Sequence, residues 1–300
     1  MKKQLYLFFL LSLSFSVFVS CKHPDNPDPA NESELPGALK GAFSISATQK
    51  AVFAKGNLQY QASTGLWRFA DQQYQMLGES NTHISSTYNG WVDLFGFATS
   101  GWDNGNTYYH PYDIATCGCN SCGYEYGPTD ADHNYDLDLV GDYANADWGV
   151  YNAISNGGNK AGLWRCLTQE ELKYLITQRP NAQEYCYHAT VDTIHGVVLL
   201  PDEWVRPTDI DASNHQYTTE QWKKMEEAGA VFLPEAGMRH EQEVWVFNKS
   251  GYYWTSTAIG GFTPDAAYAL NFSHANGVVT HSGRPTRYYG CSVRLVHELP

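Results

Sequence analysis

Three cysteines stand close together in the stretch CGCNSCG, at Cys117, Cys119 and Cys122. Clustered thiols can bind a metal ion, carry out redox chemistry or form a disulfide. A zinc ion would need a fourth ligand, which His110 or His133 could supply, although the C-x-C-x2-C spacing lacks the paired knuckles of well-known zinc folds. A redox CxxC motif needs a thioredoxin-like βαβ context, which the neighbouring residues do not predict. The choice therefore depends on the compartment in which the chain lives.

The N-terminus predicts export from the cytoplasm. Lys2 and Lys3 precede an apolar run over 5–19 that is too short to span a bilayer comfortably. This pattern is typical of a secretory signal peptide, which we assign to residues 1–20.

The end of the signal reads FVSC and resembles a bacterial lipobox, with Cys21 as the lipidated first residue of the mature chain. Phe18 departs from the usual Leu, so ordinary cleavage nearby is the alternative. Residues 21–40 alternate prolines with acidic residues, which predicts a flexible acidic tether. Acidic residues after a lipidated cysteine resemble lipoprotein export signals. We expect an outer-membrane lipid anchor with the domain at the cell surface, and the periplasmic face is the alternative.

Outside the cytoplasm, disulfides are the default for paired cysteines. Lipidation of Cys21 leaves six of the seven cysteines, half of them in the CGCNSCG cluster and half at Cys166, Cys186 and Cys291. Three cluster thiols cannot all pair among themselves, so one either reaches a distant partner or stays free. We predict one local disulfide that joins Cys122 to one of the other two cluster cysteines. Cys166 and Cys291 are expected to be small buried hydrophobic residues.

An acidic stretch carries oxygen ligands at every second position. If the chain is extended there, these side chains point to one side and could attract calcium. The stretch fails as an EF-hand, because Tyr135 stands where the loop needs Gly and Gly141 where it needs Glu. A solvated acidic loop is the alternative. The candidate calcium ligands are Asp130, Asp132, Asn134, Asp136 and Asp138.

Aromatic residues crowd the segment over 80–159, which shows little helix or strand periodicity. Rings that stack on sugar faces, beside Asn and Asp side chains, suit a carbohydrate site. The same rings could instead pin long loops to the core. The candidate ligand-binding residues are Trp91, Trp102, Tyr108, Tyr109 and Tyr124.

Short β-branched or aromatic runs, separated by Gly, Pro and Asn, predict the strands that must position these groups. Two capping boxes, TQEE from Thr168 and TTEQ from Thr218, predict two short helices. The chain is therefore expected to be an α+β protein with one domain over 41–300. The predicted strands cover 42–47, 51–54, 58–61, 67–70, 187–191, 197–200, 231–233, 244–247, 252–257, 267–272 and 292–297.

The charge argues against a nucleic-acid partner. The formal net charge is -13, and loss of two lysines with residues 1–20 leaves 17 basic against 32 acidic residues, or -15. Such a surface repels phosphate backbones. We expect membrane association only through the lipid anchor.

Four segments together resemble a known family: WRCLTQEEL over 164–172, FLPEAGMR over 232–239, GYYWTST over 251–257 and GCSVRLV over 290–296. They look like the FISUMP-type paralogous domains of bacterial lipoproteins. Those domains are related in fold to the formylglycine-generating-enzyme (sulfatase-modifying factor) group. The resemblance covers most of the chain and implies a C-type-lectin-like architecture of short, mostly antiparallel strands, two short helices and long irregular loops.

The enzymes of that group oxidise a substrate cysteine with two active-site cysteines near the C-terminal part of the fold, and they bind copper. After residue 186 this chain has only Cys291, so the oxidase chemistry cannot be carried over. No nucleophile elbow, P-loop or HExxH motif is present. We can name no catalytic residue. The sugar-binding EPN and QPD triplets of calcium-dependent lectins are also missing.

Two packing expectations follow from the family-like segments. Alternation in YYWTST puts Tyr252, Trp254 and Ser256 on one face of a strand, and we expect only one face to be core. Arg294 lies in the apolar segment SVRLV, so a buried guanidinium there should be paired with a carboxylate or a set of carbonyls.

We expect a cell-surface lipoprotein whose domain recognises a glycan or a protein without catalysis. One alternative is a divergent enzyme of the same fold that lacks the catalytic cysteine pair. Another is a structural component of a surface assembly.

Overall fold

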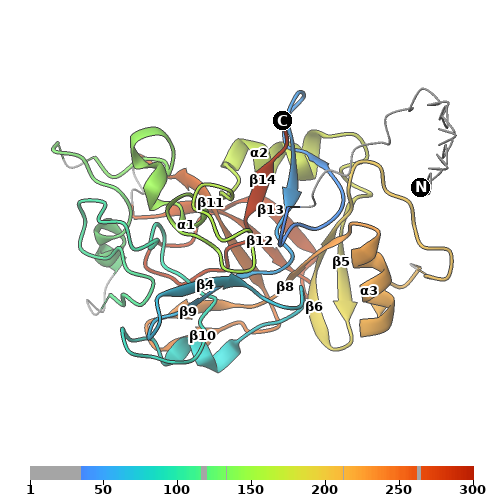
Figure 1. Ribbon diagram of the computed structural model, residues 1–300, viewed down its shortest axis with the longest axis horizontal. Coiled ribbons are helices and arrows are strands. Elements are labelled where there is room, and N and C mark those ends of the chain that lie inside the picture. The colour runs from blue at the N-terminus through green and yellow to red at the C-terminus, as the bar shows by residue number, and fades with distance from the viewer. Residues whose placement is uncertain (1–34, 116–119, 133, 212, 262–264) are drawn as a thin grey trace, which may run out of the picture. The chain divides into compact units, whose positions relative to one another are not determined.

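The computed structural model describes residues 35–115, 120–132, 134–211, 213–261 and 265–300, with only the backbone at 120–122. In this part of the chain the fold is α+β, with short and mostly antiparallel strands, as the sequence predicts (Figure 1). The strands are β1 (Phe43–Ser44), β2 (Lys50–Phe53), β3 (Leu58–Gln61), β4 (Leu66–Phe69), β5 (Cys186–Val191), β6 (Ile194–Leu199), β7 (Gln216–Tyr217), β8 (Val231–Pro234), β9 (Met238–His240), β10 (Glu243–Trp245), β11 (Gly251–Ala258), β12 (Ala267–Ser273), β13 (Val278–Gly283) and β14 (Val296–Glu298).

The described strands form several small sheets rather than one large one. The widest has the order β7-β5-β6-β8, two others run β11-β12-β13 and β1-β2-β14, and β3-β4 and β9-β10 are hairpins. The pair of β5 with β7 is parallel, through Thr190 and Val191, and the other strand pairs are antiparallel. The order places a strand from each end of the domain, β2 and β14, side by side.

Both predicted capping boxes are present. The Thr168 hydroxyl accepts the amide of Glu171, whose carboxylate accepts the amide of Thr168, and Thr218 and Gln221 repeat the pattern. The first helix continues past its α-helical part as a π-helical turn. The described helices are α1 (Trp148–Tyr151), α2 (Gln169–Lys173), α3 (Thr219–Glu227), the 3-10 helices η1 (Gly78–Thr82), η2 (Asn120–Glu125) and η3 (Gly141–Ala146), and the π-helix η4 (Tyr174–Gln178).

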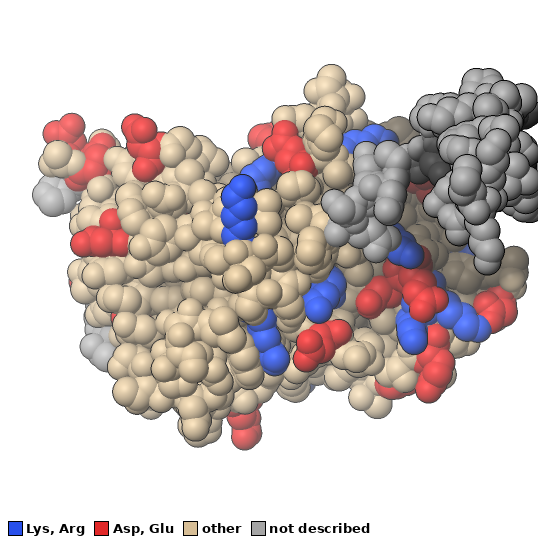
Figure 2. Space-filling view, in the orientation of Figure 1, with Lys and Arg blue, Asp and Glu red and all other residues tan. Residues whose placement is uncertain are grey.

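Helix α3 covers one face of the widest sheet and lies beside β5 and β6 (Figure 1). Its Trp222 and Met225 are buried in one apolar cluster with Val198 of β6 and Phe232 of β8. The outer face of the helix carries acidic and basic side chains, and charges gather around it on the face shown in Figure 2. This amphipathic pattern is what holds a short helix on a sheet.

Each predicted strand overlaps an observed one, but the last is mostly wrong. In the segment over 292–297 only Val296 and the residue after it are in β14. Ser292 instead forms an isolated bridge with Tyr253, and its carbonyl accepts the amide of Trp254. Three strands were missed, namely β7, β9 and β13, because they are very short or carry polar, half-exposed residues.

The expectation that β11 has only one core face is wrong. Tyr253 packs with one apolar cluster and stacks on Phe272, with ring centroids 5.8 Å apart. Trp254 points to the other side and meets Phe97 edge to face at 5.4 Å. Because β11 runs between two core clusters, both of its faces are buried and alternation cannot separate core from surface.

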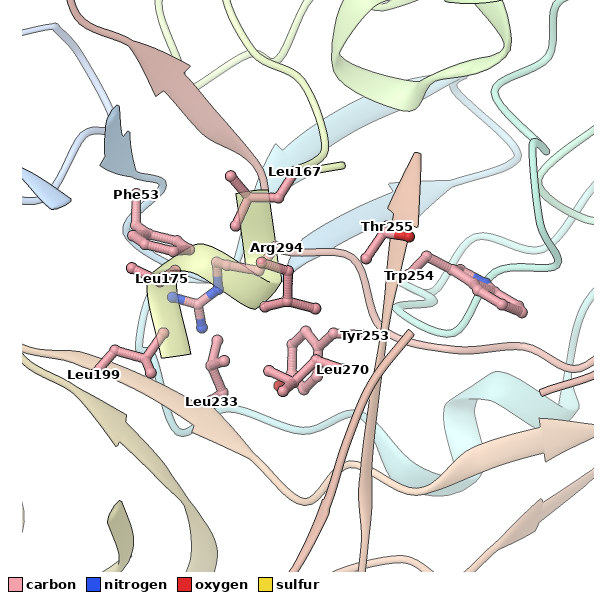
Figure 3. Close-up of a pocket in the computed structure, with 11 residues that line it drawn as sticks. Phe53, Leu167, Leu175, Leu199, Leu233, Tyr253, Trp254, Thr255, Leu270 and Arg294 are labelled. Carbon is pink, nitrogen blue, oxygen red and sulfur yellow. The ribbon is translucent and has the colours of Figure 1, made fainter. Parts of the chain in front are cut away.

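Arg294 is paired, as predicted, and its partners are uncharged oxygens. The guanidinium donates to the carbonyls of Ala54 and Phe232 and to the side-chain oxygens of Asn57 and Gln73, at 2.9 to 3.3 Å. It borders an interior cavity of about 30 Å³ that leucines of α2, β6, β8 and β12 help to line (Figure 3). A cavity of this size has room for a water molecule.

The folded unit begins before residue 41, the boundary expected from composition. Residues 35–300 form one compact unit. Ala38 makes a β-bridge with Ala54, and Leu39 is buried, so the end of the expected tether packs on the domain. No helix in the described ranges has the length and apolar character needed to cross a bilayer. The signal peptide and Cys21 lie outside the described residues.

Candidate functional site

A surface hollow of about 370 Å³ opens between the start of β5, the segment that follows β6 and the turn that leads into β7. Its volume falls within the range of pockets that hold small ligands. We call it the aromatic hollow. It is lined by Gln183, Glu184, Tyr187, Leu200, Trp204, Arg206 and His215.

The sheet holds the base of the aromatic hollow. Tyr187 is on β5 opposite Val198 of β6, and the buried Leu200 directly follows β6. Leu200 donates its amide to the carbonyl of Tyr185, which closes the β5–β6 ladder. Trp204 lies four positions beyond Leu200, on a segment without strand or helix. A rigid floor with loop-borne walls is a common arrangement in ligand sites.

His215 has an unusual backbone conformation that brings its ring into the hollow. Its φ is 53°, in the left-handed region that a residue with a Cβ rarely adopts. The carbonyl of His215 accepts the amide of Thr190, and the side chain of Asn214 accepts the amide of Gln216, so the turn is held on both sides. The imidazole then lies 4.2 Å from the Tyr187 ring, between centroids. Such strained positions cluster at functional sites.

Two phenols lie behind this ring pair. The hydroxyl groups of Tyr187 and Tyr217 are 3.1 Å apart and share a hydrogen bond. Burial raises the pKa of both phenols, while the guanidinium of Arg206 acts in the opposite direction on each. Both hydroxyls therefore stay protonated at neutral pH and can donate as well as accept hydrogen bonds.

The hollow combines apolar ring faces with several kinds of polar group. Tyr187, Trp204 and His215 offer rings, Gln183 an amide, Glu184 a carboxylate and Arg206 a guanidinium. Ring faces can cover the C–H face of a sugar, and the polar groups can pair with its hydroxyls. This arrangement suits a polyhydroxylated ligand.

The five aromatic residues predicted as a ligand site line other surfaces. The guanidinium of Arg68 lies 3.9 Å from the Trp91 ring, and Tyr108 stacks on Tyr126 at 4.9 Å. Each of these rings contacts a different neighbour, and none of the five residues lines the aromatic hollow. The remaining contacts are Tyr109 with His110, Tyr124 with Tyr135, and Trp102 with the main core cluster.

The predicted calcium ligands are partly used within the protein. One oxygen of Asp130 accepts the amides of Asp132 and Asn134, and the other accepts the Asn134 side chain. Asp138 accepts the amide of Ala258 at 2.8 Å, and Asp136 is exposed. Over the described ranges, no group of three or more His, Cys, Asp or Glu side chains is placed to hold a metal ion.

Three cysteines in the described part of the chain are free thiols. Cys166 and Cys291 are buried, as expected, and Cys186 is half-buried. Cys117, Cys119 and His133 lie outside the described residues, as does the side chain of Cys122, so the local disulfide stays a prediction. His110, the other proposed zinc ligand, contacts the Asp113 carboxylate at 3.3 Å.

Sequence reasoning missed the aromatic hollow because its residues come from three segments. Tyr187 was assigned only to a strand, and Trp204 and His215 stand in a stretch with no recognised motif. One available signal was the density of rings over 185–217, which includes Tyr185 and Tyr217.

Comparison with models of protein families, with curated proteins and with solved structures finds no match for this chain.

Proposed function

We propose that this protein is a cell-surface lipoprotein that recognises a glycan without catalysis, and that the aromatic hollow is its binding site. The observation that carries the proposal is the set of three ring-bearing residues, Tyr187, Trp204 and His215, around one hollow with amide, carboxylate and guanidinium groups.

The proposal includes the architecture and the anchor expected from the sequence. The domain is of C-type-lectin-like, FISUMP type, and a lipidated Cys21 holds it at the outer membrane. Support for the architecture comes from the α+β fold with short antiparallel strands. Metabolic labelling with a fatty acid tests the anchor, since Cys21→Ser should abolish the label. Incorporation into the Cys21→Ser chain would exclude this anchor.

Sugar binding is tested by titrating the protein with a panel of neutral and acidic oligosaccharides and following the backbone amides by NMR. Wild-type protein should show saturable shifts at Tyr187, Leu200 and His215. Trp204→Ala should weaken the affinity about tenfold, which corresponds to roughly 1.4 kcal/mol of lost stacking. Trp245→Ala is the matched control, because Trp245 is 41% exposed and lies outside the hollow.

Two results would contradict the proposed site or the proposed ligand. An equal loss of sugar affinity in Trp204→Ala and Trp245→Ala would show that the binding site is not the aromatic hollow. An absence of saturable shifts with every sugar of the panel would contradict glycan recognition.

Calcium is part of the proposal only as a stabilising ion of the loop over 130–138. A calcium titration should then release or absorb heat, and a chelator should lower the melting temperature. If neither changes, this loop binds no calcium.

A further inference from the structure

A second surface hollow, of about 270 Å³, lies between α2, the end of β11 and the segment over 139–150. Its walls are apolar, from Leu139, Val140 and Val150. Its floor consists of Asp147, Cys166 and Ser256, all buried. We call it the acidic hollow. It shares no lining residue with the aromatic hollow.

Among the residues that the structure describes, the hydroxyl of Ser256 finds no hydrogen-bond partner. Ser256 is only 2% exposed, and its backbone amide and carbonyl are already used by Leu167 and Leu139. A buried hydroxyl without a partner costs about 1 to 3 kcal/mol. Because this side chain lines the acidic hollow, a polar atom of a ligand seated there could pair with it.

The carboxyl group of Asp147 is held in place at the floor. One oxygen accepts the amide of Gly149 at 3.0 Å, and the other accepts the amide of Cys166 at 2.7 Å. The aspartate is also the N-cap of α1. Each oxygen can accept more than one hydrogen bond, so the group keeps acceptor capacity for a ligand.

The thiol of Cys166 completes the floor. Burial raises its pKa, and the carboxyl group of Asp147 raises it further. The sulfur therefore stays a neutral thiol at neutral pH, which makes it a poor nucleophile and leaves binding as the role of the hollow.

Acidic groups outnumber basic ones around the hollow. On the rim, the guanidinium of Arg165 makes two hydrogen bonds to Glu171, at 2.7 and 2.8 Å, and a third to Glu298 at 3.1 Å. Two rim carboxylates thus face one guanidinium, and the carboxyl group of Asp147, whose pKa burial raises, lies below them. Any excess of negative charge beside apolar walls favours a ligand with a cationic head and an apolar stem.

We propose that the acidic hollow binds a primary ammonium group carried on a short aliphatic chain, with the ammonium group donating to the Ser256 hydroxyl and to the carboxylates. The stem would lie along Leu139, Val140 and Val150. Such a group occurs in a lysine side chain and in a free diamine. This inference does not depend on glycan binding.

The test is an NMR titration of the folded protein with three probes of equal length, n-pentylammonium, 1-pentanol and pentanoate. The ammonium probe should bind most tightly and pentanoate least. Ser256→Ala should weaken binding of n-pentylammonium about fivefold, as expected for one lost hydrogen bond. Glu298→Gln should lower the affinity for n-pentylammonium about threefold, because it removes only a half-exposed charge. The affinity for 1-pentanol should stay unchanged.

Ser292→Ala is the matched control, because Ser292 is also a buried serine but does not line the acidic hollow. It should leave all three affinities unchanged. Equal effects of Ser256→Ala and Ser292→Ala, equal binding of pentanoate and n-pentylammonium, or no saturable shift at Val140 or Val150 would each overturn the proposal.

The source of the ammonium group is tested with two further probes. Tighter binding of Nα-acetyl-lysine amide than of cadaverine would indicate a lysine side chain of a protein partner. Tighter binding of cadaverine would indicate a free diamine.

Discussion

The imidazole of His215 lies against the phenol of Tyr187, with ring centroids 4.2 Å apart, although the His215 backbone is in the left-handed region. His215→Gly should separate the two features, because glycine adopts this conformation freely and carries no ring. We expect the sugar affinity to fall about fivefold to tenfold while the melting temperature stays the same or rises slightly.

Asn159→Gly is a control for the backbone change, since Asn159 is exposed at a φ of 50° and lies outside the hollow. It should leave the sugar affinity unchanged. Calorimetric titration and a thermal melt measure both quantities. An unchanged affinity in His215→Gly would show that the ring takes no part in binding.

The carboxyl group of Asp93 should make the stability depend on pH. It is buried and accepts hydrogen bonds from the Asn81 side chain and the Leu77 amide, and burial raises its pKa to about 6. The ordinary value of about 3.9 applies when the chain unfolds. Between these values the folded state binds the proton more tightly, so the contribution of Asp93 to the free energy of unfolding rises as pH falls from about 6 to about 4.

Urea unfolding at several pH values between 4 and 7 measures this effect. Asp93→Asn should flatten the dependence in that window, even if it lowers stability overall. Asp71→Asn, which changes an exposed carboxylate, should leave the pH dependence of the free energy of unfolding as in wild type. A curve of the same shape in Asp93→Asn and wild type would show that another group titrates.

Arg294 should be among the most sensitive positions in the core. Arg294→Met would fill a similar space but leave the side-chain oxygen of Asn57 and the carbonyls of Ala54 and Phe232 without this donor. We expect a loss of about 3 to 5 kcal/mol in the free energy of unfolding. Arg284→Met is the control, because Arg284 is exposed, and it should cost less than about 1 kcal/mol. Similar losses in both variants would contradict this account.

Val246 should be a source of strain that glycine relieves. Its φ is 50°, which is unfavourable for a β-branched side chain, and the residue is 40% exposed. Val246→Gly should raise the free energy of unfolding by about 1 kcal/mol, because the released strain of roughly 1 to 3 kcal/mol exceeds the entropic cost of glycine. Val278→Gly, in the half-exposed strand β13, should lose about 1 kcal/mol. Urea unfolding measures both changes. A lower free energy of unfolding in both variants would argue against strain at Val246.

The sequence predicted features that depend on a few neighbouring residues or on one costly group. The capping boxes of Thr168 and Thr218 need four residues each, and a charge inside SVRLV had to find acceptors. It could not predict the faces of β11, because the second core cluster is made by residues distant in the chain. The aromatic hollow could not be predicted for the same reason. His215 comes close to Tyr187 because the short strand β7 pairs in parallel with β5.

The pairing of β2 with β14 has a consequence for biosynthesis. Arg294 reaches the carbonyl of Ala54 across 240 positions, and Val296 pairs with Phe53. During synthesis from the N-terminus, β2 can pair with β1 at once, but its other edge has no partner until nearly the whole domain has been made. Long-range contacts of this kind slow folding and expose apolar strands in the meantime.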